Sequence, residues 1–545
     1  MTEEMAFNLI DEPWIKVRTA SLEVRTVSLA EALLRSQDYV DLAGELPTQD
    51  VAVLRLLLAV LHTVFSRVDE QGREKPVNNA NQALLRWKML WEGKRFPEQP
   101  IRRYLEQWYE RFWLFHPERP FYQVKHAEIG TEYSAAKLNG ELSESANKIR
   151  LFPSRGKEEK DRLSYAEAAR WLLYVNGFDD TSAKPKTKGL PSVGAGWLGK
   201  LGLIMAVGNT LFETLILNLV LLQEKNTAWG ENKPIWESEM PRESERVEIA
   251  EPDNQAELLT LQSRRILLKR ENGFVTGYTL LGGDFFQPMD AFSEQMTLWR
   301  PVYQKNTVEG FRPRRHDSSK LIWREFSTIV ETSHDKHRPG IVSWISLLKT
   351  ARLIDAQRMI HFRIASVQYG DKDFFAADVF GDQITFHADI LTEMGVIWQT
   401  MIEQEVLRCE RLAEAVGKLA GDLEKASGHT ERDGKGAVVS SRSMGAAEKA
   451  RERFYHRIDV PFRAWLERID PSQEASERIA LQTEWIKTVK GIARSLGAEL
   501  AGNAGEAALI GRSIKEGKND TARHYSTPEA MEWFGIKLDK ACKEE

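Results

Sequence analysis

ILTEMGVIWQTMIEQEVLRCERLAEAVGKLAGDLEKA, residues 390 to 426, marks the change of pattern that decides the fold. Its apolar residues recur at helical spacing, and few strand-forming residues interrupt them. Three further stretches of the same kind follow, at 445–469, 475–500 and 527–541. We therefore predict that residues 388–545 form a C-terminal helical bundle of the four-helix type.

The part of the chain before residue 388 has a different, mixed pattern. Alternating apolar and polar residues predict short antiparallel strands near the N-terminus, and they also predict a hairpin that turns at Gly370-Asp371-Lys372. Residues 46–68 predict a long core helix with Thr48 as its N-cap, and the apolar run 202–223 predicts a buried helix. The predicted fold class is α+β: a mixed α/β domain over residues 1–387 with antiparallel strands and hairpins, followed by the bundle.

The length, net charge and cysteine count of the chain limit the kinds of protein that it can be. The chain has 545 residues and a net charge of −5, from 75 basic and 80 acidic residues, which argues against a wholly basic nucleic-acid coat protein. Only Cys409 and Cys542 are present, so we expect neither a disulfide framework nor a four-thiolate zinc site. The N-terminus lacks an apolar signal core, and we expect a cytoplasmic protein without a membrane partner, a metal or another cofactor.

The segment SVGAGWLGKLG, residues 192–202, contains the pattern G-x-G-x-x-G. A dinucleotide site needs a strand before these glycines and a helix after them, but residues 183–193 contain two prolines alternating with lysine. Leu201 also stands where a phosphate-binding loop needs a hydroxyl side chain. A nucleotide site is therefore the weaker interpretation of this segment.

The lysines that precede the glycines suggest that this segment binds a different partner. Without a Cβ atom, a glycine lets the backbone approach a partner closely, and the nearby Lys184, Lys186 and Lys188 favour a partner that carries phosphate. A loop of this kind could press its main chain against the minor-groove edges of duplex DNA. A plain flexible turn remains the alternative interpretation.

No catalytic constellation stands out, and no catalytic or metal-binding residue is nominated. The pairs His316-Asp317 and His334-Asp335 resemble those of metal phosphohydrolases, although no further ligands occur at workable spacing. A metal-dependent phosphohydrolase or nuclease that uses these pairs is the alternative function, and it predicts activity from the isolated protein. A third alternative, an interaction scaffold unrelated to nucleic acid, predicts no salt-dependent DNA binding.

Five motifs, in one order along most of the chain, resemble a known family: the large subunit (CasA) of the type I-E CRISPR surveillance complex Cascade. They are FNLIDEPWIKV (7–17), HPERPFYQV (116–124), GAGWLGKLG (194–202), LQSRRILL (261–268) and ERFYHRID (452–459). The resemblance implies a subunit that is not an enzyme. It implies recognition of the protospacer-adjacent motif (PAM) in double-stranded DNA, help in opening the duplex so that guide RNA can form an R-loop, and recruitment of a helicase-nuclease.

The resemblance also implies partners and sites. The partners are crRNA, the other Cascade subunits, PAM-bearing duplex DNA and the recruited helicase-nuclease. The implied sites are a DNA-binding glycine loop (Gly194, Ala195, Gly196, Lys200), a strand-separating hairpin (Gly370, Asp371, Lys372, Asp373) and a guide-RNA anchor loop (Arg150, Phe152, Arg155).

This chain departs from the family pattern at several positions: Ala195 replaces a glycine of one relative, and the wedge and the lysine finger also differ. The wedge glutamine of a relative aligns near Lys372 or Asp373, so a wedge here must act through backbone bulk or Lys372. No lysine occurs at 288–293, where the family has a lysine finger, and Arg300 or Lys305 are the candidate substitutes. A minor-groove contact should also tolerate several PAMs, because those edges distinguish A·T from G·C but little else.

Overall fold

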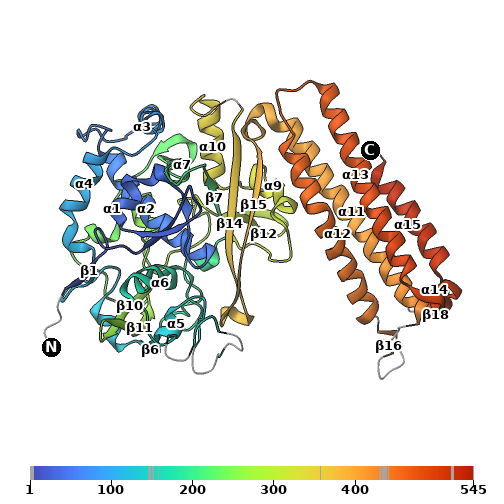
Figure 1. The fold of residues 1–545 in the computed structure, drawn as a ribbon, viewed down its shortest axis with the longest axis horizontal. Helices are drawn as coiled ribbons and strands as arrows, with labels where there is room; N and C mark the ends of the chain where they lie inside the picture. Colours follow the sequence, from blue (N-terminus) through green and yellow to red (C-terminus); the bar gives the residue numbers. More distant parts are fainter. Residues whose placement is uncertain are drawn as a thin grey trace. The chain divides into compact units, whose positions relative to one another are not determined.

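The structure is a computed structural model that describes residues 5–144, 149, 153–156, 159–355, 357–428, 431–432, 438–439, 441–516 and 521–543. The chain forms two compact units. Unit 1 comprises Met1–Ile322, Thr328–Ala356 and Ile360–Gln383, and unit 2 comprises Trp323–Ser327, Gln357–Met359 and Ile384–Glu545. Figure 1 follows the elements of each unit along the chain.

Unit 1 begins with short antiparallel strands, as the alternating pattern predicts. β2 (Ile15–Thr19) pairs with β3 (Val24–Val27) on one side and with β4 (Tyr39–Leu42) on the other, while β1 (Ala6–Asn8) pairs with β5 (Trp113–Phe115). Helices of this part are α1 (Leu29–Leu34), α3 (Ala80–Gly93) and α4 (Glu98–Gln107). The Ser28 hydroxyl caps α1 by accepting from the Glu31 N–H at 3.2 Å.

The central helix of unit 1 is α2 (Pro47–Arg67), which is buried along almost its whole length. It is long and apolar enough to cross a membrane by length and composition alone, yet 94% of its most apolar window lies inside the protein. The predicted N-cap at Thr48 is wrong. The helix begins at Pro47, because proline at the first helical position has the right φ and needs no N–H partner.

The prediction of one helix over residues 202–223 is also wrong. This run forms β7 (Leu203–Val207), α7 (Leu211–Leu217) and β8 (Leu222–Gln223), which pairs with β9 (Thr227–Ala228). The Thr210 hydroxyl accepts from the Glu213 N–H at 3.2 Å and so starts α7. The first residues instead pair with a distant strand, a tertiary contact that overrides local periodicity.

The remaining strands, which lie wholly or mainly in unit 1, form antiparallel sheets and hairpins. One sheet has the order β10-β11-β6, a second has the order β15-β14-β7, and β12 pairs with β13 alone. The bounds are β6 (Thr131–Ser134), β10 (Arg264–Glu271), β11 (Phe274–Gly282), β12 (Leu298–Gln304), β13 (Thr307–Arg314), β14 (Met359–Tyr369) and β15 (Ala376–His387). The helices among them are α5 (Ala135–Leu138), α6 (Tyr165–Phe178), α8 (Gln255–Leu259), α9 (Phe326–Val330) and α10 (Gly340–Thr350).

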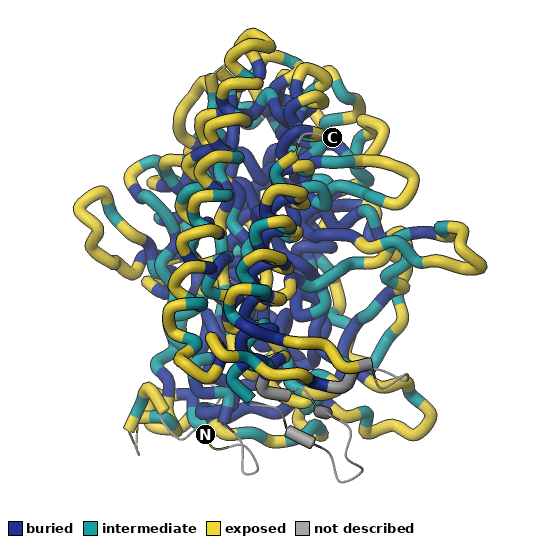
Figure 2. Tube along the Cα trace, turned by 90° about the vertical axis from the view of Figure 1, so that its right-hand side faces the viewer, coloured by how far each residue is buried: buried dark blue, intermediate teal, exposed yellow. Residues whose placement is uncertain are grey.

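Unit 2 is the predicted helical bundle. Its long helices are α11 (Val396–Ser427), α12 (Ser441–Glu467), α13 (Ala475–Gly502) and α15 (Thr527–Cys542), and they lie side by side in Figure 1. α11 packs against the other three. Figure 2 shows the expected amphipathic pattern, with exposed residues on the outer faces of the helices and buried residues between them.

Smaller elements complete unit 2. They are α14 (Gly505–Ile510), the strand pair β16 (Glu431–Arg432) and β17 (Val438–Val439), and the strand pair β18 (Arg512–Glu516) and β19 (Thr521–Tyr525). The mixed α+β fold class with a C-terminal helical bundle is confirmed. The functional assignment of residues 1–387 and 388–545 stays a prediction.

The ERFYHRID motif belongs to the core of unit 2. Phe454 and Ile458 are fully buried, and the Asp459 carboxylate accepts from the Trp323 indole N–H at 2.9 Å. The Trp323 ring stacks on Phe462 with a centroid distance of 4.2 Å. The motif therefore fastens the short segment 323–327 to the helices that follow it much later in the chain.

Candidate functional site

The GAGWLGKLG segment connects the end of α6 to β7, and only its first glycine lies at the surface. Gly194 has φ +65°, and a Cβ atom added there would meet no other atom within 4 Å. Ala195 is 2% exposed and Gly196 is buried. Of the three predicted glycine-loop positions 194–196, Gly194 alone is open to a partner in this structure, and DNA contact by the other two stays a prediction.

Gly196 has a structural role of its own. Its N–H donates to the Asp179 carbonyl at 2.9 Å, and a Cβ atom there would overlap the carbonyl of Gly177 in α6. A Cβ atom at Gly199 would likewise overlap the Tyr369 hydroxyl. Both glycines are thus needed for close packing inside unit 1, a requirement that the sequence pattern alone cannot distinguish from contact with DNA.

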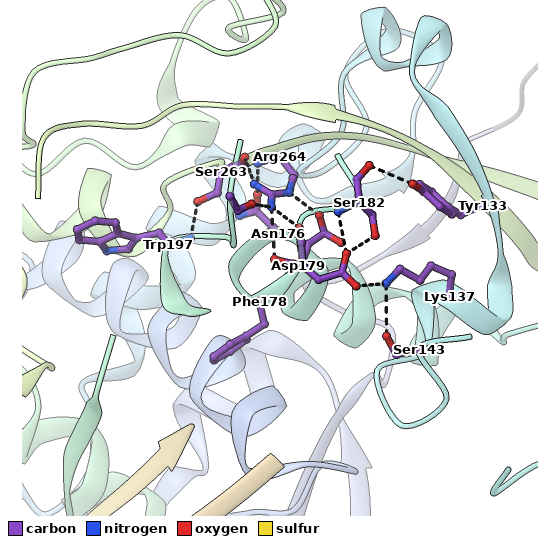
Figure 3. Close-up of polar contacts among 12 residues, drawn as sticks. Tyr133, Lys137, Ser143, Asn176, Phe178, Asp179, Ser182, Trp197, Ser263 and Arg264 are labelled. Carbon is purple, nitrogen blue, oxygen red and sulfur yellow. Dashed lines mark hydrogen bonds and ion pairs between the residues drawn. The ribbon is translucent and has the colours of Figure 1, made fainter. Parts of the chain in front are cut away.

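A buried arginine holds the loop in place (Figure 3). Arg264, 1% exposed, donates from Nε to the Asp179 carboxylate at 2.6 Å and from Nη2 to the Gly194 carbonyl at 2.7 Å. Its backbone N–H donates to the Asn176 side chain at 3.1 Å. Because Arg264 opens β10, these bonds tie the LQSRRILL motif to the glycine loop and to the end of α6.

Trp197 anchors the other side of the loop. Its backbone N–H donates to the Ser263 hydroxyl at 3.1 Å, and its indole N–H donates to the Glu294 carboxylate at 2.9 Å. Glu294 also accepts two bonds from the Arg55 guanidinium of α2, at 2.9 and 3.0 Å. The loop is therefore a fixed part of the core, not a mobile turn between elements.

The structure brings the predicted hairpin tip to this loop. The Tyr369 hydroxyl donates to the Phe178 carbonyl at 2.7 Å, and the Thr181 N–H donates to the Asp373 carbonyl at 3.0 Å. Arg315 donates from Nε to the Gly199 carbonyl at 2.5 Å and from both terminal nitrogens to the Asp373 carboxylate, at 2.6 and 2.9 Å. Sequence reasoning identified both elements but not their contact.

Lys200 lies among positive charges at the junction where the glycine loop meets the hairpin tip. Partial burial, together with Arg264, Arg246 and Arg315, lowers the pKa of Lys200 to about 8, while Asp373 opposes the shift. No carboxylate among the described residues forms an ion pair with the Lys200 ammonium group. A phosphate group is the kind of ligand that would relieve this excess of positive charge.

Exposed lysines extend the positive charge along the preceding loop. The Glu245 carboxylate accepts from the N–H groups of Lys186 and Thr187, at 2.7 and 3.0 Å, and so holds this loop against the chain next to Arg246. The side chains of Lys184, Lys186 and Lys188 are exposed and form no ion pair with any described residue. We call these three lysines, Lys200 and Arg246 the cationic strip.

Arg246 carries a further unsatisfied donor. Its guanidinium lies over the Phe285 ring, 3.7 Å from the centroid, and donates to the Ser192 carbonyl at 3.2 Å. Its buried Nε has no hydrogen-bond partner among the described residues. Burial and the nearby Arg264 lower the pKa of Arg246 to about 10, so it stays charged at neutral pH.

The hairpin tip itself presents residues that the prediction did not include. Lys372 and Asp373 both have left-handed backbone conformations, with φ +53° and +57°, and close the tight turn. Next to them, Phe374 and Phe375 are 51% and 41% exposed. The sequence places these two adjacent aromatic residues directly after the predicted turn. That position could have indicated an apolar hairpin tip.

The other predicted site residues lie elsewhere or cannot be placed. Arg150 and Phe152 of the anchor loop fall outside the described residues. Arg155 donates to the Glu167 carboxylate at 2.6 Å at the start of α6, so its charge is already paired. Of the lysine-finger substitutes, Arg300 is exposed on β12 directly opposite Arg312, and Lys305 lies at the tip of the β12–β13 hairpin.

The alternative chemistry finds no support in the geometry. His316 is buried and its Nε2 bonds to the Leu203 carbonyl at 2.9 Å, while His334 and Asp335 are exposed. Among the described residues, no three His, Cys, Asp or Glu side chains are grouped to hold a metal ion. The described part of residues 183–196 also forms no strand, and residues 198–200 form only one 3-10 turn, so the strand–helix context of a nucleotide site is missing.

Comparisons with known proteins agree on one family. The family model described as CRISPR-associated protein Cse1 matches residues 8–496. A curated relative from Thermus thermophilus, CRISPR-associated protein CasA/Cse1, is 36% identical over 231 residues, a stretch that spans 42% of this chain and 42% of that protein.

Solved structures extend the similarity over the full length. The Cse1 structure from Thermobifida fusca superimposes with a TM-score of 0.80 and 28% identity, covering 99% of both chains. A chain from a CRISPR RNA-guided surveillance complex superimposes with a TM-score of 0.67 at 17% identity, covering 99% of this chain and all of that one, which shows a shared fold.

Proposed function

The chain belongs to the Cse1 (CasA) family of CRISPR-associated proteins, and on that premise we propose that it is the large subunit of a type I-E Cascade surveillance complex. Within that complex it binds PAM-bearing duplex DNA through the minor groove and starts strand separation. Its partners are crRNA and the other subunits, the target duplex and a recruited helicase-nuclease, in the cytoplasm. Its role is binding and positioning rather than catalysis.

One observation carries the DNA-binding part of this proposal: Arg246 of the cationic strip donates to the Ser192 carbonyl, two residues before the open backbone at Gly194. The strip offers three exposed lysines, and Lys200 has no acidic partner among the described residues. Phosphate contacts fix a protein's register on a duplex, while groups that reach the groove edges distinguish base pairs. A surface glycine bordered by unpaired cations supports both kinds of contact at once.

The neighbouring hairpin supports the strand-opening step. Its tip is bonded to the same junction through Asp373 and Arg315, so a duplex held on the strip would lie close to Lys372 and the exposed Phe374. An apolar ring can replace a base in the stack at a modest unstacking cost of a few kcal/mol per step. Guide RNA then pairs with one freed strand, and base pairing reads the sequence beyond the PAM.

The test is binding of a PAM-bearing duplex to the reconstituted complex, with wild-type chain and with Lys200→Gln. We expect about five- to tenfold weaker binding to every duplex sequence, because a phosphate contact carries no base information. A matched control is Lys94→Gln, which removes an exposed lysine at the end of α3. Equal affinity of the wild-type chain and Lys200→Gln would refute the assignment of the strip.

A further inference from the structure

The HPERPFYQV motif builds a feature that the proposed DNA site does not use. The His116 ring nitrogen Nδ1 accepts from the N–H groups of Glu118 and Arg119, both at 3.0 Å, and so closes a tight turn. Pro117 and Pro120 restrict the backbone on both sides of this turn. The motif thereby fixes the backbone from which the Arg119 side chain projects.

Arg119 lines a pocket of about 50 Å³ in unit 1 together with Arg111. Its walls include Phe121 and Trp236, which pack together at a centroid distance of 6.3 Å. The Trp236 indole N–H donates to the Tyr104 hydroxyl at 2.8 Å, so this wall is held rigidly. Since one water needs roughly 10–15 Å³ of such space, the pocket can take a few waters or one small anion.

The pocket is rich in donors that lack partners. The Arg111 guanidinium has no hydrogen bond or ion pair with any described residue, and that of Arg119 contacts only the Met240 sulfur, at 3.6 Å. Ser238 and Gln262 also line the pocket, and no described residue bonds to their side-chain groups. Gln262 is only 4% exposed, and it lines the pocket, where its side chain is available to a ligand.

The electrostatics point to a negative ligand. Among the residues that the structure describes, none that lines the pocket is acidic. Burial and the neighbouring Arg119 lower the pKa of Arg111, and no described carboxylate opposes that shift. Two guanidinium groups that face the same small space repel each other unless an anion lies between them.

We propose that Arg111, Arg119, Ser238 and Gln262 form a binding site for a phosphate group. A guanidinium donates two parallel bonds to a phosphate, and the amide and hydroxyl can serve the remaining oxygens. A carboxylate, with two oxygens, would leave part of this donor set unused. The phosphate belongs either to a free phosphate compound or to a nucleic-acid chain, and both share the chemistry that the pocket recognises.

The experiment measures thermal unfolding of the full chain in sodium phosphate and in sodium chloride at equal ionic strength, and titrates phosphate by calorimetry. We expect phosphate to raise the unfolding temperature in a saturable manner, and Arg111→Gln and Arg119→Gln to weaken phosphate binding at least about tenfold. Arg111→Gln should fold normally without phosphate, because Arg111 has no described partner to lose. Arg95→Gln, which removes an exposed arginine after α3, is the matched control.

A wild-type response that chloride reproduces, or one that both pocket variants retain, would overturn the proposal. Competition by short single-stranded RNA identifies the source of the phosphate. Competition only by the 5′-phosphorylated RNA assigns a chain end, competition also by the 5′-hydroxyl form assigns a phosphodiester, and no competition assigns a free phosphate compound. The assay contains no duplex DNA, so its result is separate from that of the minor-groove proposal.

Discussion

Gly194 is the residue at which the packing and binding roles of the glycine segment separate. Gly196 and Gly199 must be glycine because the Gly177 carbonyl and the Tyr369 hydroxyl occupy the space of a side chain. Gly194 is glycine in an open position, where only its φ of +65° restricts the choice. Asparagine tolerates this backbone region better than most residues, so it can replace glycine there at small cost.

We therefore expect Gly194→Asn to weaken binding of PAM-bearing duplex at least about tenfold while it changes the unfolding temperature little, because its side chain holds the loop away from the groove. Gel shift with labelled duplex measures the first effect and calorimetry the second. Gly273→Asn is the control, since Gly273 has φ +79° and open space at the β10–β11 turn. Tight DNA binding by Gly194→Asn would contradict the contact.

Lys200 predicts a pH dependence. With a pKa of about 8, it loses its charge above that pH, so affinity for duplex DNA should fall by up to about tenfold per pH unit between 8 and 9. Lys200→Arg should flatten this profile, because arginine stays charged. A pH profile of the dissociation constant, measured for both chains, checks the effect, and identical profiles would exclude Lys200 as its source.

The lowered pKa of Lys200 also affects stability, in the opposite direction: the free energy of unfolding rises with pH, whereas the affinity for DNA falls. The unfolded lysine, with a pKa near 10.4, binds more protons than the folded one between pH 8 and 10.4. Lys200 therefore costs stability below pH 8, and that cost diminishes as the pH rises through this window. Such a cost at neutral pH is typical of a residue retained for binding.

Sequence motifs located the glycine segment but could not assign its individual glycines. The pattern G-x-G-x-x-G is the same whether a glycine faces a groove or the Gly177 carbonyl. The orientation of the loop depends on Arg264, which lies 70 residues away in the sequence and donates to the Gly194 carbonyl. The pocket at Arg111 was equally hidden, because unpaired charges can be identified only after all other pairs are known.

At the scale of elements, the β14–β15 hairpin is clamped at its tip. Asp373→Asn should break the paired geometry with Arg315 and loosen the tip, which costs at most about 1 kcal/mol of stability because both side chains are partly exposed. We expect strand opening, measured by permanganate reactivity of thymines beside the PAM, to fall more than initial duplex binding does.

The tip itself offers the matched control. Asp371→Asn removes the same charge, but the Asp371 side chain forms no ion pair with any described residue. Equal permanganate reactivity in both variants and in the wild-type chain would remove the clamp from the mechanism. Replacement of residues 370–373 as a whole should impair opening most.

The sequence predicted helices and strands correctly where a long continuous segment carries a clear apolar period. The bundle helices and the 359–387 hairpin have clear periods and turn residues, and both are confirmed. The run 202–223 failed because β7 forms through distant partners: it pairs with β14, more than 150 residues later, and Leu203 bridges to Thr297. The β12–β13 hairpin, whose tip is Lys305-Asn306, was not predicted.

At the scale of the molecule, the net charge of −5 hides the local excess of positive charge. If the five groups of the cationic strip each contact one phosphate, the logarithm of the binding constant should fall against the logarithm of salt with a slope of about −4 to −5. Replacement of Lys184, Lys186 and Lys188 by glutamine should reduce the steepness by about 3. Filter binding at several salt concentrations measures both slopes. An unchanged slope in the triple variant would show that Lys184, Lys186 and Lys188 do not contact phosphate.

Arg315 joins Gly199 to Asp373. We expect this link to make the hairpin mechanically stiff, because one guanidinium couples its turn to the main chain of the glycine segment. A load applied at the tip during strand separation would then be transmitted to the core of unit 1 and would not deform the hairpin.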